Sequence, residues 1–288
     1  MTQTLSPSAP DRIAVFMPTW KCREFLTRAI SSVVRQTHSA VNLYVGDDAS
    51  GDLDSELMNR FPEVTFLEMR DQGGPYRIDN LLLSLTESEY VAFHDADDWS
   101  VPYRFAAQIA LLTGRRLDGC GSWCLHVDLN GDPVGFDTTP GQSGLPYKGT
   151  ITSVVFHPTT LYRRRVFEIL GGFDTSTRFS ADTEFIWRAH LNFSLANVAG
   201  FLYHRTVRPS SLTQNPLTGI HTPAREIYGN LVREKAIAIV EGRDPPPAPG
   251  FLTTGRPVEF PEFDCVRWIR PGNGNTTLRD ISMLARYP

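Results

Sequence analysis

Apolar and polar residues alternate along the first half of the chain in blocks that change from strand-like to helix-like spacing and back. Short segments typical of strands lie at residues 13–17, which are wholly apolar, and at 41–46, 64–69 and 90–94. Apolar side chains recur with the spacing of one helix face at residues 25–36, 52–61, 78–85 and 102–112. Such alternation with short connections predicts an α/β fold with a mostly parallel central sheet flanked by helices.

The pattern in the second half of the chain is less regular and predicts a mixture of elements. A β-hairpin is expected from segments 120–128 and 134–136, because Asn130-Gly131 between them is a strong turn signal. A loop is expected at 141–149 and a strand at 152–157. Helices are expected at residues 165–170, 182–190 and 220–240. The last helix has an apolar face, so we expect it to pack on the core, with a second subunit or a membrane as alternative partners.

Composition narrows the class of protein. The chain has 288 residues, of which 41% are hydrophobic and 21% charged, as in an ordinary soluble globular protein. Its net charge of −4 argues against dedicated nucleic-acid binding, which requires a basic face. No run approaches the ~20 apolar residues of a membrane span, and the first residues lack the pattern of a signal peptide. We therefore expect a cytoplasmic protein whose residues 1–11 are flexible.

The four cysteines are scattered along the chain, and a cytoplasmic chain of this length does not need disulfides. Cys120 and Cys124, with His126 nearby, suggest a zinc site, but a fourth ligand at the usual spacing is missing. We therefore expect buried thiols at Cys22, Cys120, Cys124 and Cys265.

Three carboxylates, Asp95, Asp97 and Asp98, follow the fourth predicted strand. Parallel sheets bind ligands at the carboxyl ends of their strands, so this is where chemistry is expected. The three charges repel one another unless a cation neutralises them, and Mg²⁺ and Mn²⁺ commonly bridge one or two carboxylates to a phosphate. The Asp-x-Asp spacing therefore favours a clamp for a metal and a diphosphate. The alternative is a solvated acidic turn that caps the next helix.

Two more polar segments are candidates for ligand binding. Asp47 and Asp48 end the second predicted strand, where carboxylates accept hydrogen bonds from a nucleobase or a ribose. Turn and cap chemistry is an equally good interpretation, because Ser50 and Asp52 follow directly. Arg77 comes after a glycine-rich segment and either binds a phosphate or forms a surface salt bridge.

A third acidic segment contains Asp182 and Glu184 at the start of a predicted helix. A spacing of two does not put both carboxylates on one helix face, so one can face a cleft while the other serves the scaffold. A single carboxylate next to an acceptor hydroxyl would act as a general base.

These motifs, in this order, resemble the inverting family 2 glycosyltransferases over residues 12–213. Six segments carry the resemblance: FMPTW at 16–20, VGDDASGD at 45–52, GGPYRIDN at 73–80, FHDADDW at 93–99, LGGFD at 170–174 and SADTEF at 180–185. The resemblance implies the GT-A fold, which is a Rossmann-like, mostly parallel central sheet flanked by helices. It implies a transferase domain at 12–215, divided into a nucleotide-sugar half (12–100) and an acceptor half (101–215), with a helical or irregular extension at 216–288.

The resemblance also implies roles for individual residues. Asp182 aligns with the catalytic base, and Glu184 is the reserve because Ala181 replaces the usual acidic neighbour. The implied donor-binding residues are Pro18, Thr19, Asp47, Asp48, Arg77, Asp95 and Ala96. Asp95 and Asp97 would hold Mn²⁺ or Mg²⁺. The implied residues for the diphosphate or the acceptor are Arg208, Trp99 and His157.

A late metal-binding histidine of the family falls at Arg208 in this chain, while His204 lies four residues earlier. His204 therefore stands as a metal ligand or as a packed structural residue, and Arg208 as a source of positive charge for the diphosphate.

The implied function is a metal-dependent inverting glycosyltransferase that moves a sugar from a UDP-type donor to a hydroxyl of a glycan or lipid-linked acceptor. Inversion needs only one carboxylate on the acceptor side, and the sequence offers one such site apart from the metal cluster. The resemblance suggests bacterial polysaccharide biosynthesis, with peripheral membrane contact and a homodimer through the C-terminal region as further expectations. The competing interpretations are a phosphohydrolase, a sugar-nucleotide pyrophosphorylase and a non-catalytic sugar-binding module.

Overall fold

A computed structural model describes most of the chain. It covers residues 13–38, 40–138, 154–177, 180–209, 211–214, 216, 219, 222–244, 251 and 266–269. The loop predicted at 141–149, the thiol of Cys265 and most of the extension after residue 244 lie outside the described residues.

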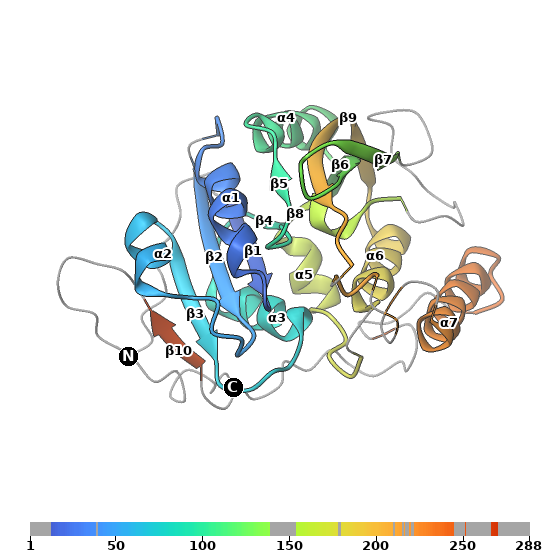
Figure 1. Ribbon diagram of the computed structural model, residues 1–288. Helices are drawn as coiled ribbons and strands as arrows, with labels where there is room; N and C mark the ends of the chain where they lie inside the picture. The colour runs from blue at the N-terminus through green and yellow to red at the C-terminus, as the bar shows by residue number, and fades with distance from the viewer. Residues whose placement is uncertain are drawn as a thin grey trace, which may run out of the picture.

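One mixed sheet runs through the molecule and has helices on both faces (Figure 1). Its parallel centre consists of β3 (Thr65–Met69), β2 (Val41–Asp47), β1 (Ile13–Thr19) and β4 (Tyr90–Phe93), in that spatial order. Residues 13–17 of the central strand β1 are fully buried, as expected for a short apolar run covered on both faces. The four strands predicted in the first hundred residues are confirmed.

The helices divide between the two faces of the sheet. One face packs against α1 (Arg23–Val34), α2 (Ser55–Arg60) and α4 (Arg104–Arg115). The other face packs against α3 (Pro75–Leu85), α5 (Arg165–Leu170) and α6 (Ala181–Asn192). Six of the seven predicted helices correspond to these elements, which confirms the α/β architecture.

The second half of the chain extends the same sheet with antiparallel and parallel strands. Beyond β4 the order is β8 (Leu161–Arg163), β6 (Gly119–Val127), β9 (Leu195–Thr206) and β5 (Trp99–Ser100). The predicted hairpin is present, because β7 (Pro133–Asp137) pairs antiparallel with β6. At the opposite edge, β10 (Val266–Ile269) pairs antiparallel with β3.

The strand predicted at 152–157 is wrong for the part that the structure describes. Residues 154–156 form no strand, and the 3-10 turn η1 (His157–Thr159) follows them. Pro158 has no backbone N–H to give to a sheet, and the hydroxyl groups of Thr159 and Thr160 donate to the carbonyls of Phe156 and His157. Local hydrogen bonds therefore replace strand pairing here.

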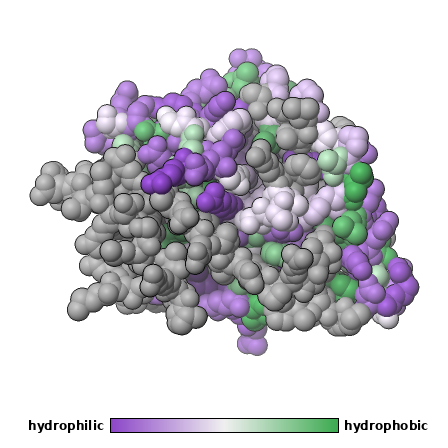
Figure 2. Space-filling view, turned by 90° about the horizontal axis from the view of Figure 1, so that it is seen from below, coloured by the Kyte–Doolittle hydropathy of each residue, from purple (hydrophilic) through white to green (hydrophobic). Residues whose placement is uncertain are grey.

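Helix α7 (Pro223–Val240) packs against α6 through a small cluster of Trp187, Val232 and Ala236. Its outer side keeps Ile227 and Leu231 exposed. Hydrophobic surface is visible at the end of the molecule that carries α7, seen from below in Figure 2. Core packing of this helix is thus confirmed for one of its faces.

The cysteine prediction holds for the described residues, since Cys22, Cys120 and Cys124 are buried free thiols. Burial raises the pKa of each thiol to about 12, so none is a thiolate at neutral pH. His126 pairs with Asp137 instead of joining the cysteines, with Nε2 and Oδ2 2.7 Å apart. In the described parts of the chain, no helix has both the length and the apolar character needed to cross a bilayer.

Candidate active site

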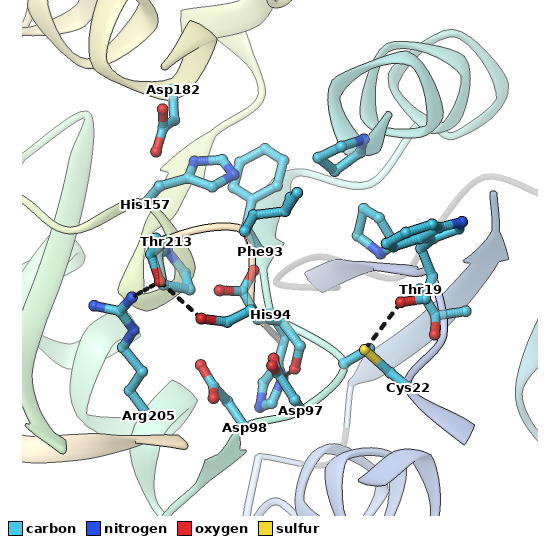
Figure 3. Close-up of a pocket in the computed structure, with 18 of the residues that line it drawn as sticks. Thr19, Cys22, Phe93, His94, Asp97, Asp98, His157, Asp182, Arg205 and Thr213 are labelled. Atoms are coloured by element: carbon cyan, nitrogen blue, oxygen red, sulfur yellow. Dashed lines mark hydrogen bonds between the residues drawn. The ribbon is translucent and has the colours of Figure 1, made fainter. Parts of the chain in front are cut away.

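A cleft of about 210 Å³ opens where β1 and β4 end (Figure 3). Its walls come from both halves of the chain and from the first turn of α7. The lining residues are Pro18, Thr19, Trp20, Cys22, Asp48, Pro75, Tyr76, Asp79, Phe93, His94, Asp95, Ala96, Asp97, Asp98, His157, Pro158, Asp182, Arg205, Thr206, Arg208, Ser211, Leu212, Thr213 and Arg225.

The carboxylates that follow β2 have different roles. Asp48 lines the cleft and accepts hydrogen bonds from the backbone N–H groups of Gly73 and Gly74, at 2.8 and 2.9 Å. It thereby ties the end of β2 to the loop before α3. Asp47 is fully buried and accepts from the backbone N–H groups of Ser50 and Gly51. In the structure, Asp47 therefore serves the turn, whereas Asp48 reaches the cleft.

Thr19 and Arg77 complete the predicted donor side. The Thr19 hydroxyl donates to Asp52 at 2.6 Å, and the same carboxylate accepts from the backbone N–H of Cys22, so Asp52 fixes the turn after β1. Pro18 and Thr19 line the cleft. The Arg77 side chain folds back over Gly73 and is not part of the lining.

Asp95, Asp97 and Asp98 lie together in the cleft after β4 (Figure 3 labels the last two). Asp97 Oδ2 accepts from Arg208 Nε at 2.6 Å, and Asp98 Oδ1 accepts from the backbone N–H of Thr206 at 2.8 Å. Burial, reinforced by the charge of Asp97, raises the pKa of Asp95 to about 7. Burial, together with the charges of Asp97 and Asp95, raises the pKa of Asp98 well above its ordinary value.

Trp99 and His204 lie outside the lining of this cleft. Their rings stack on each other at 5.0 Å with an interplanar angle of 3°, because β5 and β9 pair these two residues directly. The Arg28 guanidinium lies 4.0 Å from the centre of the Trp99 ring and also donates to the backbone carbonyl of Asp97. The structure therefore gives His204 a packing role beside the cleft, with Arg208 as the cation next to Asp97.

At the other side of the cleft, Asp182 stands in the first turn of α6. Its Oδ1 accepts from the Tyr76 hydroxyl at 3.0 Å and from the backbone N–H of Thr183. A carboxylate is favoured at this position because the helix dipole is positive at its N-terminus.

Glu184, two residues later, points into the protein. It is fully buried, and both of its oxygens accept from Arg188 Nε, at 2.8 and 2.9 Å. Arg188 also donates to the carbonyls of Leu170 and Gly172, so the pair holds the loop after α5. The sequence left the choice of base between Asp182 and Glu184. In the structure their surroundings differ, because Asp182 lines the cleft and Glu184 is paired inside the protein.

Asp79 and His157 are among the lining residues that have a buried polar atom without a partner. Asp79 Oδ1 and His157 Nδ1 make no hydrogen bond within the described chain. Burial raises the pKa of Asp79 well above its ordinary value, and the charges of Asp95 and Asp182 add to the effect. Burial lowers the pKa of His157 to about 4. Asp79 lies in the segment 73–80 that carries the family resemblance, but no pattern in that segment indicated that its side chain faces the cleft.

The donor set of the cleft suits a hard divalent cation. Asp95 and Asp97 supply carboxylate oxygens, and Mg²⁺ or Mn²⁺ is typically held by one or two carboxylates together with substrate phosphates and water. Within the described ranges, no group of three or more Asp, Glu, His or Cys side chains gathers as a metal site. A cation there would therefore depend on the phosphates of a substrate, and it would compete with Arg208 for Asp97.

Comparison with known proteins identifies relatives of this chain. The model of the family described as "Glycosyl transferase family 2" matches residues 14–171, which is more than half of the chain. The chain is 26% identical over 174 residues to an uncharacterized glycosyltransferase, alr2836, of Nostoc sp., and this match covers 54% of the chain and 52% of the relative. The matches span between 13% and 52% of the lengths of its curated relatives.

A second curated relative is more distant but has a specific name. It is the UDP-Glc:alpha-D-GlcNAc-diphosphoundecaprenol beta-1,3-glucosyltransferase WfaP of Escherichia coli, 21% identical over 101 residues. The match covers 34% of the chain and 40% of the relative.

Among solved structures, two crystal structures of residues 1–349 of S. aureus TarS are similar to this chain. The complex with UDP has a TM-score of 0.59 at 19% identity and covers 81% of this chain and 71% of TarS 1–349. The complex with UDP-GlcNAc has a TM-score of 0.60 at 18% identity and covers 81% and 72%. At such identities the likeness concerns the fold alone, and it confirms the expected GT-A architecture.

Proposed function

The chain belongs to glycosyl transferase family 2, and from that premise we propose that it moves a sugar from a UDP-linked donor to an acceptor hydroxyl, with inversion at the anomeric carbon. Its curated relatives are named as glycosyltransferases, among them a putative colanic acid biosynthesis glycosyl transferase, WcaA of Escherichia coli, which supports an enzyme of the glycosyltransferase type. The observation that carries the proposal is a single cleft with Asp95 and Asp97 on one side and Asp182 on the other.

Asp182 is the general base in this proposal. Tyr76 and the backbone N–H of Thr183 both bind Oδ1, so the carboxylate is oriented and Oδ2 is assigned to take the proton of the acceptor hydroxyl. The acceptor oxygen then attacks the anomeric carbon from the side opposite the diphosphate. The bond between that carbon and the diphosphate oxygen breaks, and the diphosphate leaves with the electron pair.

Asp95 and Asp97 would hold Mn²⁺ or Mg²⁺ next to the donor diphosphate. Such a cation supplies Lewis-acid stabilisation of the charge that grows on the leaving group. Arg208 lies next to Asp97 with its side chain only 11% exposed, which fits a second positive charge for the same diphosphate. Asp48, Pro18 and Thr19 line the cleft at the ends of β2 and β1, where the nucleotide is expected.

The relatives support the choice of UDP. TarS has been solved with UDP and with UDP-GlcNAc, and WfaP is named for the use of UDP-Glc on a diphosphoundecaprenol-linked sugar. We extend the proposal to a glycan or lipid-linked saccharide as the acceptor. Contact with the cytoplasmic face of a membrane, and dimerisation through residues 216–288, are further predictions that belong to it.

A thermal-shift assay with UDP, UDP-glucose and UDP-GlcNAc, each with and without Mn²⁺, tests the donor and the metal. A bound donor raises the melting temperature by mass action, so the wild-type protein should be stabilised by at least one UDP ligand, and more strongly with Mn²⁺. In Asp97→Ala, the additional rise in melting temperature that Mn²⁺ causes should be lost. Asp132→Asn, in the exposed turn of the β6–β7 hairpin, is the matched control and should behave as wild type.

The base assignment is tested by transfer measured under the same conditions. Asp182→Asn should keep donor binding and lose about 10²- to 10⁴-fold in turnover. Unchanged donor affinity and turnover in Asp97→Ala would exclude the metal clamp, and full transfer activity in Asp182→Asn would exclude the base.

A further inference from the structure

Asp79 and His157 lie in the cleft but take no part in the steps above. Asp79 is one turn into α3, and His157 begins η1. Their side chains are 2% and 11% exposed. Asp79 Oδ2 and His157 Nε2 are 4.0 Å apart, which is too long for a hydrogen bond.

The fold has no evident need for these two polar groups. His157 packs on Phe93, with ring centres 4.4 Å apart, and Tyr76 and Phe173 flank the same ring. Its neighbours are thus largely aromatic, and an apolar side chain would suit them at least as well. A buried polar atom without a partner costs free energy. Asp79 Oδ1 and His157 Nδ1 therefore destabilise the protein when no ligand is bound.

Both groups lie between the two ends of the proposed reaction. The charges of Asp95 and of Asp182 both act on Asp79, and the charge of Asp182 acts on His157. Figure 3 shows His157 between Asp182 and the carboxylates that follow β4. In the proposed function, the donor sugar lies between the diphosphate and the attacking hydroxyl. It therefore occupies the space between the carboxylates that follow β4 and Asp182.

We propose that Asp79 and His157 are the recognition site for the donor sugar and select it by the configuration of its ring hydroxyls. The inference rests on the proposed function. A ring hydroxyl both donates and accepts, so it can satisfy a carboxyl oxygen and an imidazole nitrogen. The rings around His157 offer an apolar surface for the C–H face of the sugar, as is usual in small-ligand sites.

The selectivity has a physical basis. A sugar with the matching hydroxyl satisfies the buried polar atoms, whereas its epimer leaves one of them unpaired. Sites that hydrogen-bond a substrate hydroxyl reject analogues that lack it far more strongly than apolar pockets reject a change in size. Asp79 and His157 would therefore discriminate between donors while contributing little to UDP binding.

The test compares UDP with UDP-glucose, UDP-galactose and UDP-GlcNAc by calorimetry on the full chain with Mn²⁺. The wild-type protein should bind one of the three UDP-sugars at least tenfold more tightly than the other two UDP-sugars. Asp79→Leu should lose that preference while its affinity for UDP changes less than twofold. Asp79→Asn, which keeps an acceptor and a donor, should retain part of the preference.

Stability separates recognition from a structural role. Asp79→Leu and His157→Phe each replace an unsatisfied polar group by an apolar one, so their melting temperatures should equal or exceed that of wild type. The matched control is Asp118→Asn, which alters a buried carboxyl that binds Arg165 and the backbone N–H of Ser194 away from the cleft. This control should lose stability and keep the sugar preference.

The outcomes are distinguishable. If wild type prefers one sugar and Asp79→Leu keeps the full preference, the inference is overturned while the proposed function stands. If Asp79→Leu changes the choice of acceptor and leaves the choice of donor intact, the inference is also overturned. If wild type binds UDP and none of its sugars more tightly, the recognition site is excluded, and if it binds no UDP ligand, the proposed function fails first.

Discussion

Asp182 and Glu184 are two residues apart and yet have opposite roles in the structure. About 200° of helix rotation separates their side chains, so one faces the cleft and the other faces the core. Both residues were candidates for the base, because a sequence shows the carboxylates and not their surroundings. The deciding feature is Arg188, one turn after Glu184, which makes a buried ion pair inside the protein.

Glu184→Gln should destabilise the protein by about 3–5 kcal/mol, because it leaves the buried Arg188 guanidinium without its counter-charge. Urea unfolding measures the loss. Asp182→Asn is the matched comparison. It keeps the oxygen that accepts from Tyr76 and should change the free energy of unfolding by less than about 1 kcal/mol. Equal stability of wild type and Glu184→Gln would mean that the pair does not hold the loop after α5.

The buried imidazole of His157 predicts a pH dependence of stability. Burial lowers its pKa from 6.5 to about 4 in the folded state, while the unfolded chain keeps the ordinary value. Between these two values the unfolded state binds more protons, so His157 contributes stability above pH 6.5 that is lost as the pH falls towards 4. Tyr76, Asp79 and Asp182 lie close to the imidazole, and only the last has a charge that opposes the shift.

His157→Phe removes this titration and should be progressively more stable than wild type as the pH falls. The difference in free energy of unfolding should grow by up to about 1.4 kcal/mol per pH unit between pH 6.5 and 4. Denaturant unfolding at several pH values measures it. The difference between the two proteins isolates His157, because Asp79, Asp95 and Asp98, whose raised pKa values act in the opposite direction, are present in both. A difference that is constant with pH would show that the imidazole is not titrated in this range.

At the scale of elements, the position of α3 matters most for the cleft, since this helix carries Tyr76 and Asp79. It lies so close to β2 that a Cβ on Gly46 would come within 2.4 Å of Ile78 Cγ2. The bare backbone of Gly46 therefore sets the distance between strand and helix.

Gly46→Ala should cost about 1–3 kcal/mol of stability, because α3 must shift or Ile78 must leave its rotamer. Donor affinity should fall as well, since α3 forms one wall of the cleft. Gly229→Ala, in α7 where a Cβ meets nothing within 4 Å, is the matched control and should stabilise the protein by about 0.5–1 kcal/mol. Urea unfolding and calorimetry with UDP measure the two effects, and unchanged stability in Gly46→Ala would contradict the close packing.

The strands β1 to β4 could be predicted from the sequence because each is a short, mainly apolar segment between polar turns. The strands β5 and β8 could not, since they have two and three residues and depend on pairing with distant partners. β9 was missed because Asn197, Gly200 and polar residues after it interrupt the apolar pattern. The site shows the same limit. Strand-end carboxylates were visible in the sequence, whereas the Arg208–Asp97 pair joins residues 111 positions apart.

At the scale of the whole molecule, a single sheet joins the two halves that the sequence suggested. β4 belongs to the first half and pairs with β8 of the second, and β8 in turn pairs with β6. The cleft combines groups from both halves, and Arg225 adds a residue of the C-terminal extension. Asp97 follows β4, and Asp182 begins α6, which packs on the same sheet, so one continuous scaffold positions both carboxylates.

The stack of Arg28, Trp99 and His204 has a practical consequence. Trp99 is two residues from Asp97, and the guanidinium above its ring also donates to the carbonyl of Asp97. Any shift of this loop on arrival of a cation or a diphosphate would change the electric field at the indole, and with it the colour and yield of its emission. Trp99 is thus a built-in fluorophore beside the candidate active site, and Trp20, which lines the cleft, is a second one. A change in their emission on addition of UDP and Mn²⁺ would time ligand arrival in a stopped-flow instrument without an attached dye.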